Sequence, residues 1–251
     1  MARLPEIVSY VDQRLKIDEI KDFPGASNGL QVANKGVVKK IGAAVDANLS
    51  SFQEAARREV DFLVVHHGLF WEAEAPLVGA RYQKWALLFE HDIAIYSSHL
   101  PLDCHPDLGN NVQLLKQIGL SPKETFGNYQ GRDIGCIAEF VGSRHQLRSQ
   151  LEGLFPKGIK AIEYGSTEPN RVAVLTGSGQ SVIKLLKPAG VDTLITGELK
   201  QQAFSTAQDE ELNLYICGHY ATETFGVRAL AQELAEAFSL PWEFIPSCCI
   251  L

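Results

Sequence analysis

Apolar residues recur along the chain with two spacings, one typical of helices and one typical of buried strands. Residues 4–15 place apolar side chains on one helical face, whereas Phe62-Leu63-Val64-Val65 is a continuous apolar run that indicates a buried parallel strand. A strand over residues 37–45 and a helix over residues 52–58 precede this run, so the three segments predict a βαβ unit. The pattern continues with predicted helices at 81–90, 112–118, 146–155 and from 219 onward, and with predicted strands at 93–96, 134–141 and 159–164.

The second half of the chain repeats the first. Residues 41–45 and 60–64 align without gaps on residues 172–176 and 191–195, at an offset of about 131 residues. Because this offset is half the chain length, it indicates one duplicated domain and not a solenoid of short repeats. We therefore predict a duplicated α/β fold.

The repeat extends to the next predicted strand. The segment Ile95-Tyr96-Ser97-Ser98-His99 resembles Tyr215-Ile216-Cys217-Gly218-His219. Between the two copies, residues 121–132 are polar and contain glycine, as expected where two halves are joined. We place the first half at residues 1–125 and the second at residues 126–251.

The composition is that of a soluble globular protein, with 45% hydrophobic and 21% charged residues among 251. The chain has neither an apolar run that could cross a bilayer nor an N-terminal signal core, so we expect it in the cytoplasm. A net charge of -7 argues against a broad nucleic-acid interface and suits bound cations. The five cysteines have no regular spacing, so they predict neither a disulfide framework nor a zinc knuckle.

Two adjacent histidines, His66 and His67, follow the apolar run directly. In open α/β sheets ligands bind in the crevice beyond the carboxyl ends of the strands, which is where these side chains fall. Neutral imidazole is a common metal ligand, and two consecutive histidines can serve two neighbouring ions or two corners of one. The alternative is a core or helix-capping pair that is hydrogen-bonded to the backbone.

Two other strand ends carry a histidine followed four residues later by a carboxylate. These pairs are His99 with Asp103 and His219 with Glu223. On a helix, side chains at this spacing can reach the same point. A core histidine beside a carboxylate that interacts with the helix dipole is the alternative explanation of each pair. The recurrence of such pairs at neighbouring strand ends favours a metal site.

Two further carboxylates and one glycine-containing loop are candidates for the same site. Glu198 aligns with the adjacent histidines in the repeat, and it could be a general base or a carboxylate that orients a ligand. Asp46 could cap a helix or support a metal ligand. The loop Thr176-Gly177-Ser178-Gly179-Gln180 resembles a phosphate-binding turn, but it lacks the full pattern of the known motifs.

Imidazole and carboxylate ligands without cysteine suit Mn, Fe, Co, Ni or Zn. Five or six such ligands suit two divalent ions that share a bridging water, which would be acidified to a hydroxide nucleophile. A metal-dependent hydrolase acting on a nucleotide-like or other small polar substrate is the leading hypothesis. A metal-handling protein or a metal-stabilised assembly is the second hypothesis, and a regulatory interaction module is the third.

The chain resembles the Ngg-interacting-factor-three-like family, known in bacteria as GTP cyclohydrolase 1 type 2 homologs. The resemblance extends over essentially the whole chain, and its motifs are Asn28-Gly29-Leu30-Gln31-Val32, Val45-Asp46, Asp61-Phe62-Leu63-Val64-Val65-His66-His67-Gly68, His99-x-x-x-Asp103, Gly109-Asn110-Asn111, Thr196-Gly197-Glu198 and Gly218-His219-x-x-x-Glu223.

This resemblance implies a duplicated three-layer α/β/α fold with two intertwined halves and a dinuclear site. The implied metal ligands are His66, His67, Asp103, His219 and Glu223, with His99 as a further ligand or a close neighbour of one. It also implies a toroidal homohexamer built from dimers, in which the metals face an inner cavity.

Overall fold

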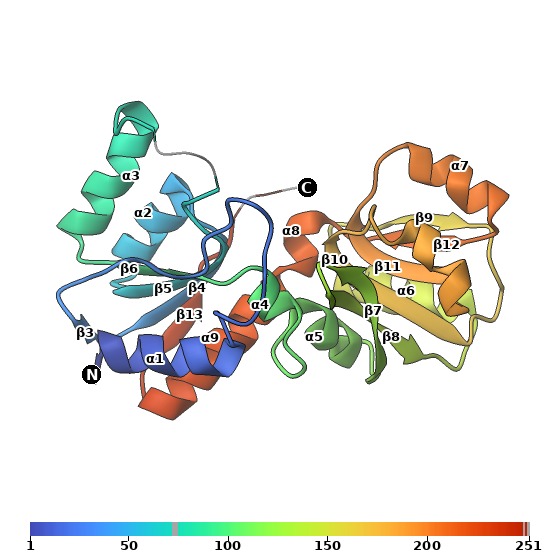
Figure 1. Cartoon of the computed structure of the whole chain (residues 1–251), viewed down its shortest axis with the longest axis horizontal. Coiled ribbons are helices and arrows are strands. Elements are labelled where there is room, and N and C mark those ends of the chain that lie inside the picture. Colours follow the sequence, from blue (N-terminus) through green and yellow to red (C-terminus); the bar gives the residue numbers. More distant parts are fainter. Residues whose placement is uncertain (72–74, 248, 250–251) are drawn as a thin grey trace. The chain divides into compact units, whose positions relative to one another are not determined.

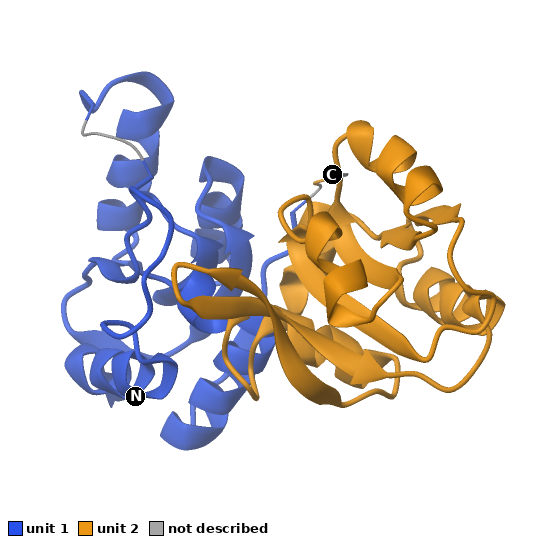
Figure 2. Cartoon of the chain, turned by 45° about the vertical axis from the view of Figure 1, so that its right-hand side comes forward, with its two compact units in different colours: residues 1–102, 226–248 blue, residues 103–225, 249–251 orange. Residues whose placement is uncertain are grey.

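The computed structural model describes residues 1–71, 75–247 and 249. The chain forms two compact units, which Figure 2 colours separately. Unit 1 contains residues 1–102 and 226–248, and unit 2 contains residues 103–225 and 249–251. The chain thus leaves unit 1 earlier than the division expected at residue 125, and it returns to unit 1 near the end because the last helix and strand belong there.

Unit 1 is built on a mixed sheet of five strands in the order β13-β4-β5-β6-β2. Strands β4, β5, β6 and β13 are parallel, and β2 is antiparallel to β6. The strands are β2 (Gly29–Val32), β4 (Ile41–Asp46), β5 (Phe62–His67), β6 (Ala94–Ser97) and β13 (Trp242–Phe244), and β1 (Ala2–Arg3) pairs separately with β3 (Val37–Val38).

Helices cover both faces of this sheet (Figure 1). On one face, Leu63 and Val65 of β5 share a buried cluster with Phe52 of α2 and Leu88 of α3. The other face carries α1 and α9, which are joined by an ion pair between Arg14 and Glu233. The helices are α1 (Leu4–Leu15), α2 (Leu49–Arg57), α3 (Gly79–Glu90) and α9 (Thr224–Phe238). A short helix, α4 (Leu100–Asp103), follows β6 where the chain leaves this unit. Unit 1 therefore has the predicted three layers.

Unit 2 contains a second mixed sheet, with six strands in the order β7-β8-β10-β11-β12-β9. Leu114 of α5 and Leu147 of α6 pack against Val174 and Ile195 on one face, and α7 lies on the other (Figure 1). The strands are β7 (Pro122–Tyr129), β8 (Arg132–Glu139), β9 (Lys160–Glu163), β10 (Arg171–Ser178), β11 (Thr193–Glu198) and β12 (Asn213–Ile216). The helices are α5 (Asn110–Gln117), α6 (Arg144–Leu154), α7 (Gln202–Asp209) and α8 (His219–Thr222), with 3-10 turns η1 (Ile183–Leu185) and η2 (Lys187–Ala189).

The strand registers confirm the duplication. Gly42 pairs with Leu63 in unit 1, and Ala173 pairs with Leu194 in unit 2 at the aligned positions. The alignment predicted for the third strand is wrong by one residue. Val64 pairs with Tyr96, and the equivalent Ile195 pairs with Tyr215 and not with Ile216.

The two tyrosines therefore occupy equivalent positions. Each is fully buried, and each donates its hydroxyl to a carboxylate, Tyr96 to Asp12 and Tyr215 to Glu163. Burial is the main cause that raises the pKa of both phenols. Between the buried tyrosine and the following histidine, unit 2 therefore has one more residue than unit 1. Gly218 lies in this segment, and its φ of 96° is a backbone conformation that favours glycine.

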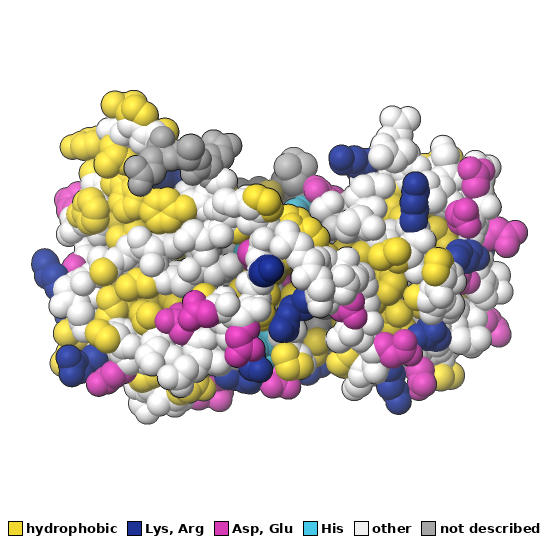
Figure 3. Space-filling view, viewed as in Figure 1, with side chains coloured by type: hydrophobic (Ala, Val, Ile, Leu, Met, Phe, Trp, Pro, Cys, Tyr) yellow, Lys and Arg dark blue, Asp and Glu magenta, His cyan; other side chains and the backbone are white. Residues whose placement is uncertain are grey.

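The segment expected to join the two halves, residues 121–132, is instead mostly strand β7. Five residues of β7 are exposed because it is an edge strand, and this gives it the polar composition of a linker. Helix α3, in contrast to the polar β7, has apolar side chains at exposed positions. It fully buries only Leu88, whereas Val78 before it and Tyr82 and Phe89 within it are exposed, and Figure 3 shows apolar side chains gathered there.

Candidate metal centre

Three imidazoles converge in unit 1. His66 and His67 are the last residues of β5, and His99 follows the neighbouring strand β6. One ring nitrogen of each lies within 4.8 Å of the others. The ring centroid of His66 is 4.8 Å from those of both His67 and His99. We call these three residues the histidine cluster.

Each imidazole of the histidine cluster is oriented through the same ring atom, Nδ1. The Nδ1 of His66 lies 3.0 Å from the carbonyl oxygen of Ser98. The Nδ1 of His67 lies 2.8 Å from Oδ1 of Asp46, and the Nδ1 of His99 lies 2.8 Å from Oδ1 of Asp22. Because these oxygens accept hydrogen bonds, Nδ1 is the donor atom of each ring, and Nε2 is the atom of each ring that would bind a metal ion. This is how metal-binding histidines are commonly held.

Asp22 was not predicted from the sequence, although four hydrogen bonds hold its carboxylate beside His99. Its oxygens accept hydrogen bonds from the backbone of Phe23 and Leu100 and from the side chains of Asn28 and His99. Burial alone would raise the pKa of Asp22, but these hydrogen bonds outweigh it and the pKa lies below its usual value. Asn28 also accepts from the backbone N–H of His99, so the predicted Asn28-Gly29 turn helps to position this ring.

Aromatic rings pack against the histidine cluster. Trp71 lies edge-on to His99 with centroids 5.0 Å apart, and it lies 6.1 Å from His67. Its indole N–H donates to the carbonyl of Gly68, and Phe23 contacts His99 from another direction. The neighbouring Phe70 packs against Trp85 and not against the histidines. The cluster is therefore a shielded site with fixed rings.

Unit 2 contains a second group of candidate ligands. His219 begins α8, and its Nε2 lies 3.1 Å from Oε1 of Glu223. Its Nδ1 lies 3.3 Å from Oε1 of Glu198, at the end of β11. The hydrogen bond with Glu223, acting against burial, raises the pKa of His219 to about 9. Glu223 is 3% exposed, whereas the side chain of Glu198 is 52% exposed.

Two glycines leave room for this group. A Cβ atom on Gly177 would lie 2.2 Å from Oε1 of Glu223, and one on Gly197 would lie 2.7 Å from Cα of His219. The backbone N–H of Gly177 donates to Oγ1 of Thr222, one residue before Glu223. Larger residues at either position would displace the His219–Glu223 pair.

Asp103 is buried in unit 2 at the end of α4. Its Oδ1 accepts a hydrogen bond of 2.8 Å from Asn110, and its backbone carbonyl accepts one of 3.3 Å from Asn111. Asn111 also bonds the carbonyl of Ile134 and the backbone N–H of Thr176. The predicted Gly109-Asn110-Asn111 motif thus ties Asp103 to the sheet of unit 2.

The residues present fit divalent metal ions. A separation of 3.1 Å between Nε2 of His219 and Oε1 of Glu223 is close to the spacing of two ligands that share one ion at about 2.1 Å. In the histidine cluster, the Nδ1 atoms bond to oxygen acceptors, so Nε2 is the atom of each ring that would bind an ion. Both groups lack sulfur, in keeping with the predicted borderline metals.

The loop of residues 176–180, which resembles a phosphate-binding turn, uses its backbone amides for hydrogen bonds within unit 2. Its Gly177 N–H bonds Thr222, and its Gly179 N–H bonds the carbonyl of Glu198. Gln180 accepts from the N–H of Lys200. Because these two glycine amides bond within unit 2, the loop shapes the surroundings of Glu223 and is not arranged around an anion.

The remaining three histidines of the sequence lie outside the two groups. His91 and His145 are exposed. His105 is buried in its loop, where its Nδ1 accepts from the backbone N–H groups of Asp107 and Leu108. The helix that follows Asp46 is capped by Asn48, so Asp46 supports His67 and does not cap the helix.

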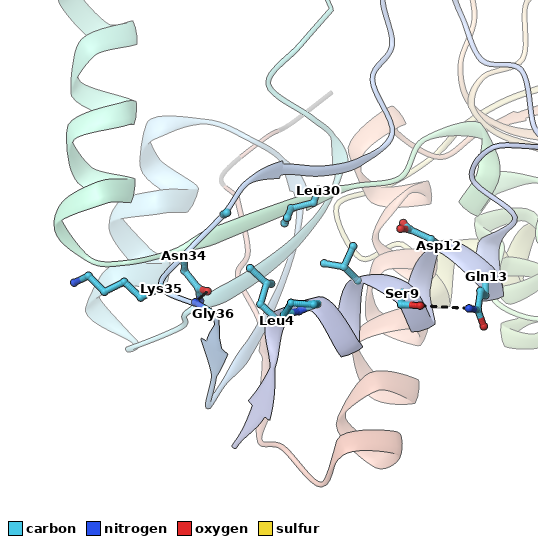
Figure 4. Close-up of a pocket in the computed structure, with 11 residues that line it drawn as sticks. Leu4, Ser9, Asp12, Gln13, Leu30, Asn34, Lys35 and Gly36 are labelled. Atoms are coloured by element: carbon cyan, nitrogen blue, oxygen red, sulfur yellow. Dashed lines mark hydrogen bonds between the residues drawn. The ribbon is translucent and has the colours of Figure 1, made fainter.

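A cavity of about 750 Å³ lies elsewhere in unit 1, between α1 and β2 (Figure 4). Leu4, Val8 and Leu30 supply much of its apolar lining, and Asp12 is engaged by the hydroxyl of Tyr96. None of the candidate ligands lines it. Its size alone does not make it the site of metal chemistry.

Comparisons with known proteins agree with this architecture. The model of the family described as Duf34/NIF3 (NGG1p interacting factor 3) matches residues 2–248. A protein of Pyrococcus abyssi called GTP cyclohydrolase 1 type 2 homolog is 40% identical over 245 residues, which cover 96% of this chain and 97% of that protein. A Salmonella typhimurium protein of the same name is 37% identical over 244 residues, or 96% of each chain.

Two solved structures have the same fold. TTHA1606 from Thermus thermophilus superposes with a TM-score of 0.89 at 36% identity, covering 100% of both chains. Reduced HcgD from Methanocaldococcus jannaschii superposes with a TM-score of 0.85 at 28% identity, covering 98% of both chains.

Proposed function

Because the chain belongs to the Duf34/NIF3 family, we propose that it binds two divalent metal ions and uses them to hydrolyse a small polar substrate. The observation that carries this proposal is the orientation of the histidine cluster. Three imidazoles converge, and an oxygen acceptor holds the Nδ1 of each. A core histidine needs one such hydrogen bond, whereas three converging rings that are each held through Nδ1 support a metal site.

We assign the metal ligands to both units. The histidine cluster supplies His66, His67 and His99, and unit 2 supplies Asp103, His219 and Glu223. Support comes from the buried carboxylates, because an ionised carboxylate in a protein interior is stabilised by a cation. The chain thus offers six candidate ligands, three in each unit, which is more than the about four that a single zinc-like ion takes. These imidazole and carboxylate ligands suit Mn, Fe, Co, Ni or Zn.

The chemistry of the site follows from these ligands. Bound divalent ions supply Lewis acidity and an acidified water at neutral pH. The chain itself holds the ligand rings in one tautomer, through Asp22 and Asp46 in unit 1. Glu198 has two possible roles, a base that takes a proton from water or a positioning residue for His219. The 3.3 Å contact with Nδ1 of His219 matches the roles of Asp22 and Asp46, so the geometry favours positioning.

The favoured role of Glu198 gives weight to the second hypothesis, a metal-handling or metal-stabilised protein without catalysis. Glu198→Gln separates the two roles. If Glu198 is the base, this change lowers turnover strongly while the metal content stays at the wild-type value. If it positions His219, the variant binds metal more weakly and its turnover per bound metal is little changed.

The test of the proposed function is metal analysis followed by a substrate screen. Protein purified without chelator should contain about two divalent ions per chain. Because the curated relatives are called GTP cyclohydrolase 1 type 2 homologs, GTP is the first substrate to test, followed by phosphoesters and cyclic amides. Absence of metal after supplementation would refute the site. Full metal content without turnover of any substrate would favour metal handling.

We also propose the setting in which this activity occurs. The expected assembly is a closed homo-oligomer, a toroidal hexamer, and the expected location is the cytoplasm. The net charge of -7 supports a small-molecule substrate over a nucleic acid. No helix in residues 1–71 and 75–247 is both long and apolar enough to cross a bilayer.

A further inference from the structure

A second cavity adjoins the histidine cluster in unit 1. It has a volume of about 360 Å³, within the range of small-molecule pockets. Its lining includes Phe70, Trp71, Arg81, Lys84 and Trp85. Trp71 is shared, since the same indole contacts the rings of His67 and His99. We call this cavity the Trp71 pocket.

The walls of the Trp71 pocket are aromatic and held in place. Phe70 and Trp85 lie with ring centroids 6.0 Å apart and planes tilted by 36°. Trp71 is fixed by the hydrogen bond from its N–H to the carbonyl of Gly68. Flat, preorganised aromatic surfaces favour a planar ring as the bound group, because stacking then costs little conformational entropy.

The polar side chains in the pocket lining are cationic. The Nζ of Lys84 donates to the carbonyl of Ala47, whose own N–H donates to the carbonyl of His67, so this charge is held next to the metal site. Arg81 is half-buried, and its guanidinium makes no hydrogen bond or ion pair within the part of the chain that the structure describes. No carboxylate appears among the described residues that line the pocket. A guanidinium in this position is suited to an anion.

We propose that the Trp71 pocket binds a planar aromatic ring that bears a negatively charged group, as in a purine nucleotide, beside the metal-binding histidines. The ring packs against Phe70, Trp71 and Trp85, and the anion pairs with Arg81 and Lys84. This inference rests on the proposed function, since it names the substrate class of the same site. The position of the pocket brings such a ligand to the side of the histidine cluster that Trp71 covers.

The test is calorimetric titration of the full chain, both as purified and after removal of metal with a chelator. The metal-free sample is needed because nucleotide phosphates also bind divalent ions. The probes are adenosine monophosphate, adenosine, inorganic phosphate and 2-naphthoate. We expect adenosine monophosphate to bind at least ten times more tightly than adenosine or phosphate. Tighter binding of 2-naphthoate would assign the anion to a carboxylate instead of a phosphate, within the same ligand class.

Two variants locate the binding. Arg81→Met keeps the length of the side chain and removes its charge, so it should weaken adenosine monophosphate at least tenfold and leave adenosine unchanged. Trp85→Ala should weaken both. The control is Tyr82→Ala on the same helix, because Tyr82 is 61% exposed and does not line the pocket. Its affinities should equal those of the wild type.

The inference is overturned if neither adenosine monophosphate nor 2-naphthoate binds, or if Arg81→Met binds both as the wild type does. Arg81→Met keeps this test decisive even if Trp85→Ala fails to fold. Metal analysis of the same samples keeps the two proposals apart. Normal metal content without ligand binding contradicts only the pocket, and ligand binding by protein that cannot take up metal contradicts only the metal centre.

Discussion

At the scale of single residues, the candidate centre depends on the partners of its ligands as much as on the ligands. His66 is oriented by a neutral carbonyl, His67 by a partly exposed carboxylate and His99 by a buried one. A buried carboxylate increases the electron density of the imidazole more than a carbonyl does, because no water screens it. The rings should therefore differ as ligands although their geometry is similar.

Asp22→Asn tests this difference. The amide cannot accept all four hydrogen bonds that Asp22 receives, so we expect metal affinity to fall about 10- to 100-fold. The metal-free protein should also lose about 1–3 kcal/mol of stability because buried donors lose their acceptor. Competition with a chelator and urea unfolding measure the two quantities.

Asp46→Asn is the matched control for Asp22→Asn. The side chain of Asp46 is 33% exposed, against 4% for Asp22. Metal affinity should again fall, but the loss of stability should be smaller because water can replace the missing acceptor. Equal stability losses in both variants would contradict the role given to burial.

The raised pKa of His219 predicts a pH dependence. In the metal-free protein the charged ring is stabilised by Glu223, and the pKa of about 9 exceeds the ordinary value of about 6.5. This contribution to stability is complete below about pH 6.5 and is lost as the pH rises through about 9. Urea unfolding of the metal-free proteins between about pH 6 and 9.5 measures this contribution. The free energy of unfolding of the wild type should exceed that of His219→Gln by an amount that decreases as the pH rises.

Metal binding to His219 has the opposite pH dependence. An ion must displace the proton from Nε2, so the affinity of this ligand should rise with pH up to about 9. Chelator competition at several pH values measures this slope. A pH-independent affinity, in wild type and His219→Gln alike, would remove His219 from the ligand set.

At the scale of elements, the sequence predicts the helices and strands whose apolar residues recur with a regular spacing. Helix α1 begins and ends at the predicted residues 4 and 15, and β5 contains the predicted apolar run. The polar composition of β7, which follows from its edge position, predicts a linker where the structure has a strand. Asp22 was missed because it lies outside every periodic segment and its partner His99 is 77 residues away. Contacts of that length depend on tertiary packing, which local spacing does not encode.

The turn after β10 provides a test at this scale. Gly177→Ala would place a Cβ atom 2.2 Å from Oε1 of Glu223, at a residue whose φ is 63°. We expect a loss of stability above about 1 kcal/mol and a lower metal content. Thermal unfolding and elemental analysis measure both.

Gly119→Ala is the control for the backbone strain in Gly177→Ala. Its φ is 76°, and its Cβ atom would meet nothing within 4 Å among the described residues. Both variants should share the strain, whereas only Gly177→Ala should lose metal. If Gly119→Ala also lost metal, the effect would be one of general stability.

At the scale of the whole molecule, the duplicated halves carry different ligands on equivalent frameworks. Unit 1 offers three imidazoles as candidate ligands, and unit 2 offers an imidazole with carboxylates. The expected closed assembly predicts one species at the mass of a hexamer in light scattering at micromolar concentration. A monomer mass would refute the hexamer, and dissociation only after chelation would support the metal-stabilised assembly.

The return of the chain to unit 1 has a consequence for biosynthesis. The edge of β4 is paired by β13, yet about 145 residues separate the end of β6 from the start of β13. At translation rates of about 5–20 residues per second, that edge stays open for roughly 7–30 s. Unit 2 is meanwhile synthesised almost without interruption, so it can complete its sheet first. The nascent first sheet is then the part of the molecule that needs protection from edge-to-edge association on the ribosome.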